Sequence, residues 1–230
     1  MRENQISLIN SSFFRKLSTR SKQNRTYVIA DANIEIRFGD RIGLIGPNGS
    51  GKTTLLRLMS GIFQPDSGSV ILNTDVMTIL DAGFGLDHAL TGRENTRTLL
   101  ILGGIERSDR VKTIEFIEEF SELGQYFDQP VKNYSSGMLI RLVLAAQIAM
   151  MDKKGLIIDE GFGTADAAFQ RKTFDRIEQM LIGVPFIVIA SHNEQMLRDY
   201  CTRGIVVENG KIQFDGSIEQ ALDHYHQAKA

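Results

Sequence analysis

The sequence lacks several features that would indicate a secreted or nucleic-acid-binding protein. It contains one cysteine, Cys201, and cannot form an internal disulfide bond, which is typical of proteins in a reducing cytosol. Its formal net charge is −2, so bulk electrostatics give no attraction for nucleic acid. We therefore expect no nucleic-acid partner.

Long apolar runs are also absent. A helix needs roughly 20 apolar residues to span a bilayer, and the best candidates, 142–151 and 186–190, are much shorter. Residues 1–10 are mixed in character and the stretch after them is basic, so no signal peptide is predicted. If the protein serves a membrane, another chain must supply the spans.

The sequence does contain a pattern of short strands and helices that predicts an α/β fold. Strand-forming residues at 6–9, 27–29 and 34–38 predict an antiparallel β part near the N-terminus. A basic segment lies among them, at 13–25. It is either a solvated loop or a surface that approaches acidic head groups or an anionic substrate.

Helical patterns follow between about residues 84 and 150. Thr91 and Glu94 have the spacing of a capping box, which predicts the start of a helix. An apolar stripe predicts a second helix facing the core, and its members are Val111, Ile114, Phe116, Ile117 and Phe120. We expect this helical subdomain to belong to a single domain spanning residues 1–230.

From about residue 155 strands and helices alternate again. Residues 156–158 and 186–189 are continuous apolar runs, typical of strands buried on both faces of a parallel sheet. A closing β-hairpin is predicted at 208–211, where Asn-Gly supplies the turn. The core sheet is therefore expected to be parallel or mixed.

The most informative motif is the loop G-x-x-x-x-G-K-T at residues 46–53. An apolar strand at 41–45 precedes it and a helix at 54–59 follows it, the context that a phosphate-binding loop requires. Its glycines let several backbone N–H groups face one anion, and the helix N-terminus adds its dipole. The nucleotide-binding residues expected here are Gly46, Pro47, Asn48, Gly49, Ser50, Gly51, Lys52, Thr53 and Thr54.

Two carboxylates, Asp159 and Glu160, follow the apolar strand at 156–158. Ligands bind at the carboxyl edge of open α/β sheets. Asp159, with the Thr53 hydroxyl, is therefore expected to hold Mg²⁺, and Glu160 to polarise an attacking water.

A third motif, Tyr134-Ser135-Ser136-Gly137-Met138, precedes an apolar helix that runs to residue 149. Ser-Ser-Gly before a helix is a common N-cap, and a serine hydroxyl, the glycine N–H and the helix dipole also fit an anion site.

Two further positions fall after predicted strands. Asp166 follows Asp159 by seven residues, and His192 follows the strand that ends at residue 190.

In this order the motifs resemble those of the ATP-binding-cassette family over nearly the whole chain. The matched positions are the phosphate loop (46–53), the signature (135–138), the Walker B carboxylates (Asp159, Glu160), the D-loop aspartate (Asp166) and the switch histidine (His192). The resemblance implies a P-loop ATPase of ABC type that uses ATP and Mg²⁺.

Departures from the family pattern indicate one branch of it. Tyr134 and Met138 replace the usual Leu and Gln of the signature, and no glutamine stands at the glutamine-loop position, where Asp81 is the nearest polar candidate for a metal ligand. With Leu-Thr-Gly-Arg-Glu-Asn at 90–95, these features resemble ATPase subunits that export capsular polysaccharide, O-antigen or teichoic acid.

The resemblance also implies a site shared between two chains. In a head-to-tail homodimer, Ser135, Ser136 and Gly137 of one chain would close on the γ-phosphate held by Lys52 of the other. Glu160 would orient the attacking water, and Lys52 and His192 would act on the γ-phosphate.

Adenine would stack on an upstream aromatic residue. Phe14 and Tyr27 both qualify, and Phe14 is favoured because Arg15 follows it.

The implied partner is an integral-membrane permease, with the ATPase held peripherally at the cytoplasmic face of the inner membrane while the complex handles the polysaccharide. The loop at 83–95, which carries Phe84, Leu86 and Leu90, would receive the permease. The alternatives are a non-transport ABC ATPase, an ABC ATPase for another substrate such as a lipid, and a small-molecule P-loop kinase. The kinase would not explain the signature, Asp166 and His192.

Overall fold

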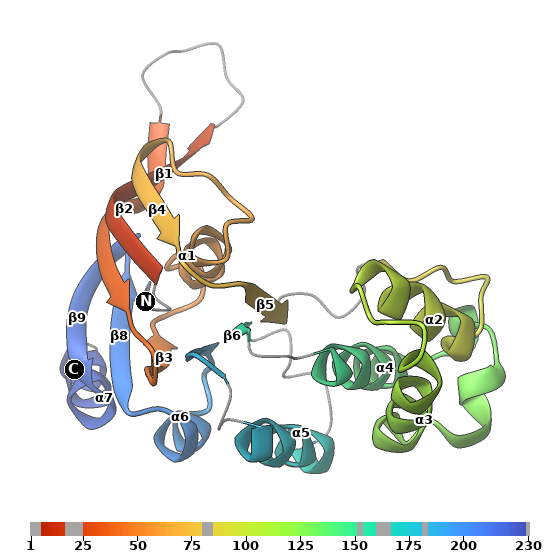
Figure 1. The fold of residues 1–230 in the computed structure, drawn as a ribbon. Helices are drawn as coiled ribbons and strands as arrows, with labels where there is room; N and C mark the ends of the chain where they lie inside the picture. The colour runs from red at the N-terminus through yellow and green to blue at the C-terminus, as the bar shows by residue number, and fades with distance from the viewer. Residues whose placement is uncertain are drawn as a thin grey trace. The chain divides into compact units, whose positions relative to one another are not determined.

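The computed structural model describes residues 6–16, 25–79, 85–150, 154–159, 167–180 and 184–228. The chain divides into two compact units, drawn in Figure 1. The first, the sheet unit, contains residues 1–78, 154–160 and 184–230. The second, the helical unit, contains residues 79–153 and 161–183. None of the described helices combines the length and apolar character that crossing a membrane requires.

The main sheet has the strand order β5-β6-β7-β3-β8-β9. Its strands are β5 (Val76–Ile79), β6 (Gly155–Ile158), β7 (Ile187–Ala190), β3 (Arg41–Ile45), β8 (Arg203–Glu208) and β9 (Lys211–Ser217). Strands β6, β7, β3 and β8 run parallel, whereas β9 is antiparallel to β8. Every residue of β6 and β7 is buried, so the predicted mixed sheet with doubly covered central strands is confirmed.

A second, antiparallel sheet contains β2 (Arg25–Ile36), β1 (Ile6–Lys16) and β4 (Ser67–Leu72), in that order. The prediction of separate strands at 27–29 and 34–38 was wrong, because the single strand β2 contains 27–29 and 34–36 and ends there. Its second half alternates buried and exposed residues from Asp31 to Ile36, which is the pattern of a strand with one covered face. Residues 13–16 of the expected loop also belong to β1.

Three helices complete the described sheet unit: α1 (Lys52–Met59), α6 (Glu194–Tyr200) and α7 (Ile218–Gln227). Helices α6 and α7 pack on β3 and β8, where two glycines make room for them. A Cβ atom on Gly43 would lie 3.1 Å from Ile218 and Leu197, and one on Gly204 would lie 2.4 Å from the Cβ of Ala221. Cys201 is buried beside them, and burial raises the pKa of its thiol to about 12, so the thiol stays protonated and unreactive.

The helical unit contains α2 (Gly92–Leu102), α3 (Arg110–Ser121), the 3₁₀ turns η1 (Gly124–Asp128) and η2 (Val131–Asn133), α4 (Ser136–Ala149) and α5 (Ala167–Met180). Helix α5 joins the others through Phe169, which meets Phe120 edge-on at 5.8 Å and lies under the guanidinium of Arg141 at 4.7 Å. Lys172 extends the contact by an ion pair with Glu122. The capping box at Thr91 and Glu94 is present as predicted.

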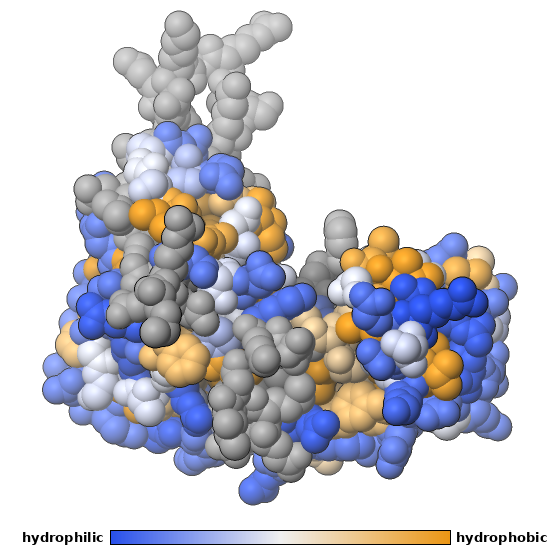
Figure 2. All heavy atoms as spheres, in the orientation of Figure 1, coloured by the Kyte–Doolittle hydropathy of each residue, from blue (hydrophilic) through white to orange (hydrophobic). Residues whose placement is uncertain are grey.

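The predicted core stripe of α3 was wrong at one position, Val111, which is 65% exposed. Ile114, Ile117 and Phe120 are buried as expected. At 3.6 residues per turn, Val111 lies about 120° around the helix from the centre of that face. With Ile101 and Leu102 it belongs to the exposed apolar residues of this unit, whose surface shows apolar atoms among largely hydrophilic ones (Figure 2).

Candidate functional site

Three loops of the sheet unit leave the same edge of the main sheet. The glycine-rich loop follows β3, Asp159 follows β6, and Ser191 and His192 follow β7. These strands are parallel neighbours, with Leu44 opposite Ala190 and Ile158 opposite Ile189. The carboxyl ends of the three strands therefore bring the loops together, as the sequence predicts for Lys52, Asp159 and His192.

The glycine-rich loop is held by close backbone contacts that exclude side chains. A Cβ atom on Gly46 would lie 2.1 Å from the carbonyl oxygen of Val207, and one on Gly51 would lie 2.8 Å from that of Val28. Both glycines also have positive φ, 155° and 108°. No other residue type fits these two positions without displacing the backbone.

The tip of the β8–β9 hairpin supports this loop, a role that the sequence did not predict. The Gly210 N–H donates a 3.0 Å hydrogen bond to the Ser50 carbonyl, and the Gly210 carbonyl accepts one from Ala30. Asn209 and Gly210 have φ of 49° and 75°, which confirms the predicted hairpin with its Asn-Gly turn. The Asn-Gly pair was the signal for the turn, but nothing in the sequence indicated what the turn contacts.

Lys52 begins α1 and is 6% exposed. Its Nζ donates to the carbonyl oxygens of Gly46, at 2.7 Å, and Pro47, at 3.1 Å. Burial lowers the pKa of Lys52, and the nearby charge of Asp159 opposes that shift. A buried ammonium that rests on two neutral carbonyls would gain from an anionic partner in the loop.

Other groups here fit a phosphate and a metal ion. The Ser50 hydroxyl is buried and has no hydrogen-bond partner among the described residues. Thr53 is exposed in the first turn of α1, and Asp159 is 6% exposed. Hydroxyl and carboxylate oxygens are suitable Mg²⁺ ligands, with phosphate oxygens as further ones. In the described part of the chain no cluster of three His, Cys, Asp or Glu could hold a metal by itself.

His192 contacts the glycine-rich loop directly. Its Nε2 lies 2.6 Å from Oδ1 of Asn48, and both side chains are exposed. The histidine is thus held at the mouth of the loop.

The signature segment opens α4 in the helical unit. Ser135 is the N-cap, and its hydroxyl accepts a 3.2 Å hydrogen bond from Met138 N–H. Ser135 and Ser136 are exposed, and a Cβ atom added to Gly137 would meet only Ser135 Oγ, at 3.9 Å, within 4 Å. The cap leaves this face open to a ligand.

Several predicted residues lie outside the described part of the chain, namely Glu160, Asp166, Asp81 and Phe84. Of the two adenine candidates, Phe14 lies in β1 and Tyr27 in β2, directly opposite each other in the strand register. Leu86 and Leu90 of the expected permease loop are half-buried.

Comparisons with known proteins identify the family. The model of the family described as "ABC transporter" matches residues 29–163. The chain belongs to the ABC transporter family. It is an ATPase of the ABC type, and the fold agrees: the chain is similar to the solved dimeric structure of a bacterial ABC transporter cassette, with a TM-score of 0.79 at 20% identity over 93% of this chain and 98% of the other.

Curated members of the family are similar at higher identity. The O-antigen export system ATP-binding protein RfbE of Yersinia enterocolitica is 44% identical over 83% of this chain and 77% of its own length. The polysialic acid transport ATP-binding protein KpsT of Escherichia coli is 37% identical over 90% of this chain and 92% of its own length. The expected resemblance to polysaccharide-export ATPases is confirmed.

Proposed function

We propose that this ABC ATPase powers export of a cell-surface polysaccharide across the cytoplasmic membrane. The observation that carries the proposal is the 44% identity, over 83% of the chain, to an O-antigen export ATP-binding protein. Similarity to a polysialic acid transporter and to a teichoic acids export protein of Staphylococcus haemolyticus, at 37% and 35% identity, supports the same class of cargo.

The residues at the carboxyl edge of the main sheet would divide the work on ATP. Lys52 would exchange its contacts with Gly46 and Pro47 for the β- and γ-phosphates and neutralise charge there. Glu160 would orient the attacking water, and His192 would contact the γ-phosphate from the loop mouth. Thr53 and Asp159 would hold Mg²⁺, with Asp81 as a further candidate. The bound Mg²⁺ supplies positive charge that stabilises the transferring phosphoryl group.

The working assembly in this proposal is a homodimer with an integral-membrane permease. The signature residues Ser135, Ser136 and Gly137 would cross to the partner chain's ATP, and Asp166 would lie between the two sites. The ATPase would sit peripherally on the cytoplasmic face of the inner membrane. Closure around ATP and opening after hydrolysis would move the permease helices.

The test uses Glu160→Gln in the complete transporter. This variant should bind ATP normally but lose turnover by about 10²-fold or more, the scale of losing a general base. Cells that carry it should lose surface polysaccharide and accumulate the polymer inside. Glu115→Gln, on the exposed face of α3, is the matched control and should change neither measurement.

Two outcomes would contradict separate parts of the proposal. Near-normal hydrolysis by Glu160→Gln would remove that residue from the catalytic role. Lost hydrolysis with unchanged surface polysaccharide would show that the cargo is of another class, such as a lipid.

A further inference from the structure

Two segments of the helical unit that are distant in sequence are joined by hydrogen bonds. One is the turn segment, residues 85–95, and the other is the pre-signature segment, residues 126–134. Backbone hydrogen bonds connect them: Val131 N–H to the Leu90 carbonyl at 2.9 Å, Lys132 N–H to the His88 carbonyl at 3.0 Å, and Gly92 N–H to the Gln129 carbonyl at 3.3 Å.

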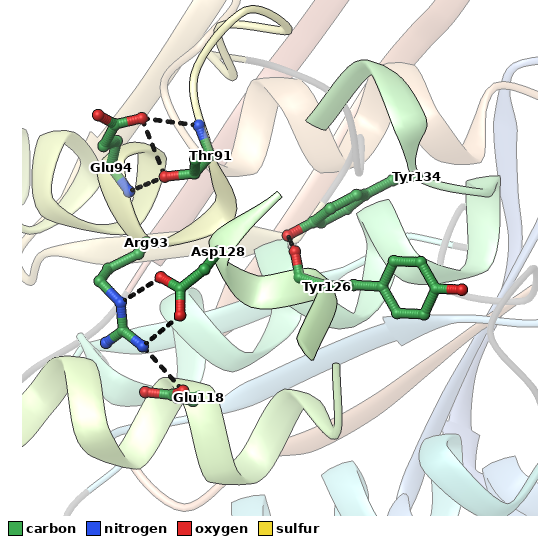
Figure 3. Close-up of polar contacts among 7 residues, drawn as sticks. All are labelled: Thr91, Arg93, Glu94, Glu118, Tyr126, Asp128 and Tyr134. Atoms are coloured by element: carbon green, nitrogen blue, oxygen red, sulfur yellow. Dashed lines mark hydrogen bonds and ion pairs between the residues drawn. The ribbon is translucent and has the colours of Figure 1, made fainter. Parts of the chain in front are cut away.

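Arg93 reinforces this connection with its side chain (Figure 3). Its guanidinium binds both carboxylate oxygens of Asp128, at 2.6 and 3.1 Å, and one oxygen of Glu118, at 2.8 Å. It also lies 4.8 Å from the centre of the Phe127 ring. The hydrogen bond from Arg93 holds the pKa of Asp128 below its ordinary value, so the pair stays charged near neutral pH. Such a fork fixes orientation as well as distance.

The Tyr134 side chain touches the turn segment at Gly92, and a hydrogen bond within the pre-signature segment holds its hydroxyl in place. It is 9% exposed, and its hydroxyl donates a 2.7 Å hydrogen bond to the carbonyl oxygen of Tyr126, while the Tyr126 ring points away (Figure 3). A Cβ atom on Gly92 would lie 2.2 Å from this hydroxyl. Burial raises the pKa of Tyr134 to about 12, so its hydroxyl remains a donor at neutral pH. Gly92 and Tyr134 therefore touch with no room for a methyl group between them.

The turn segment is itself rigid because Asn95 ties its residues together. The Asn95 carbonyl accepts from Asp87 N–H at 2.7 Å, and its amide donates to the carbonyls of Asp87, at 2.9 Å, and Thr91, at 3.0 Å. The side chain is 2% exposed. In contrast, Asp87, His88 and Ala89 at the front of the turn are exposed, so another molecule can reach this end.

Tyr134 immediately precedes Ser135, the N-cap of α4. We propose that Arg93 and Tyr134 are positioning residues that join the turn segment to the signature, so that a displacement of the turn moves Ser135, Ser136 and Gly137. The proposal rests on the function proposed above, in which those three residues close on ATP across the dimer. The proposal also explains why this chain has a tyrosine at position 134, where the family usually has leucine.

The test distinguishes a change in the position of the signature residues from a general loss of protein stability. It uses the full chain in the Glu160→Gln background and measures three quantities: ATP affinity at low protein concentration, the protein concentration at which ATP drives dimer formation, and the thermal midpoint. Gly92→Ala forces a methyl group against the Tyr134 hydroxyl. We expect it to raise the concentration needed for dimerisation about tenfold or more, while ATP affinity, set in the sheet unit, changes less than about twofold.

Conservative variants supply the controls. Tyr134→Phe removes the hydroxyl and should weaken ATP-driven dimerisation about threefold to tenfold, the scale of one lost buried hydrogen bond. Combined with Gly92→Ala it should recover part of the loss, because the nearest clashing atom is gone. Tyr126→Phe removes the hydroxyl of a more exposed tyrosine, leaves the Tyr126 carbonyl that accepts from Tyr134 in place, and should match the parent chain.

Arg93→Lys keeps the charge but not the two-point contact with Asp128, and should weaken ATP-driven dimerisation as Tyr134→Phe does. The control Arg107→Lys, at an exposed position, should leave dimerisation unchanged. The inference is overturned if Gly92→Ala lowers only the thermal midpoint, or if Tyr134→Phe and Tyr126→Phe give the same dimerisation. All three measurements use ATP and no exported cargo. The test therefore remains valid even if the cargo proves not to be a polysaccharide.

Discussion

Lys52 carries its charge in a place that water barely reaches. Its Nζ donates to two backbone carbonyls, at 2.7 and 3.1 Å, and the nearby charge of Asp159 favours its protonated form. Burial therefore lowers its pKa, and a bound phosphate would raise it again. Proton binding and nucleotide binding are coupled at this residue.

The coupling predicts how ATP affinity depends on pH. Only the protonated Lys52 attracts phosphate, so affinity is retained below its pKa and lost as the pH rises through it. Because burial lowers that pKa, the loss of affinity should begin at a lower pH than for an exposed lysine. Titrations with a fluorescent ATP analogue would measure it. Lys52→Ala should bind more weakly and lack this loss; parallel profiles for the two proteins would show that another group titrates.

At the scale of elements, the β8–β9 hairpin is part of the nucleotide site although none of its residues is expected to touch ATP. Its tip holds the Ser50 carbonyl, and the Val207 carbonyl leaves no room for a side chain on Gly46. The phosphate loop thus owes its shape to strands that follow it by more than 150 residues.

Gly210→Ala tests this support. The residue has φ of 75°, and an added Cβ would lie 2.5 Å from the Val28 carbonyl. We expect the free energy of unfolding to fall by about 2 kcal/mol or more and ATP affinity to fall several-fold, as measured by denaturant titration and calorimetry. Gly39→Ala shares the positive φ but has open space around it, so it should destabilise by only about 1 kcal/mol and bind ATP normally. If both variants lose ATP affinity equally, the hairpin tip does not support the phosphate loop.

Local patterns in the sequence predicted most elements, and contacts between distant segments explain what they missed. The apolar runs at β6 and β7, the capping box at Thr91 and the Asn-Gly turn each carry their own signal within a few residues. Val111 was placed wrongly because an apolar residue in the first turn of a helix looks the same whether or not another element covers it.

The contacts of Gly92 were not predictable, for a related reason. Its nearest neighbour, the Tyr134 hydroxyl, is 42 positions away in the sequence, and a glycine gives no indication of the atom that excludes a side chain. In the same way, the motifs predicted Lys52, Asp159 and His192 at one edge of the sheet, but not the contact of His192 with Asn48. Motif order fixes which strands bear the residues, whereas side-chain partners depend on packing.

At the scale of the whole molecule, the proposed ATP site is divided between the two units. The sheet unit carries Lys52, Asp159 and His192, and the helical unit carries the signature at the N-terminus of α4. If the signature acts on the partner chain's ATP, each chain contributes one half of two sites. A chain with a defective phosphate loop and a chain with a defective signature should then form one intact site when they pair.

Mixing two inactive variants tests this arrangement. Lys52→Ala removes the phosphate grip, and Gly137→Glu puts a negative charge where the γ-phosphate of the partner would lie. A Cβ atom at Gly137 meets only Ser135 Oγ within 4 Å, and an acidic residue suits the first turn of a helix, so we expect this variant to fold. Each variant alone should be nearly inactive. In an equal mixture about half of the dimers pair the two variants, and each of these has one intact site, so about a quarter of the parent ATPase activity should return.

The control Gly137→Ala, which adds no charge, should retain most activity by itself. A mixture no more active than its components would mean that the signature serves the ATP of its own chain.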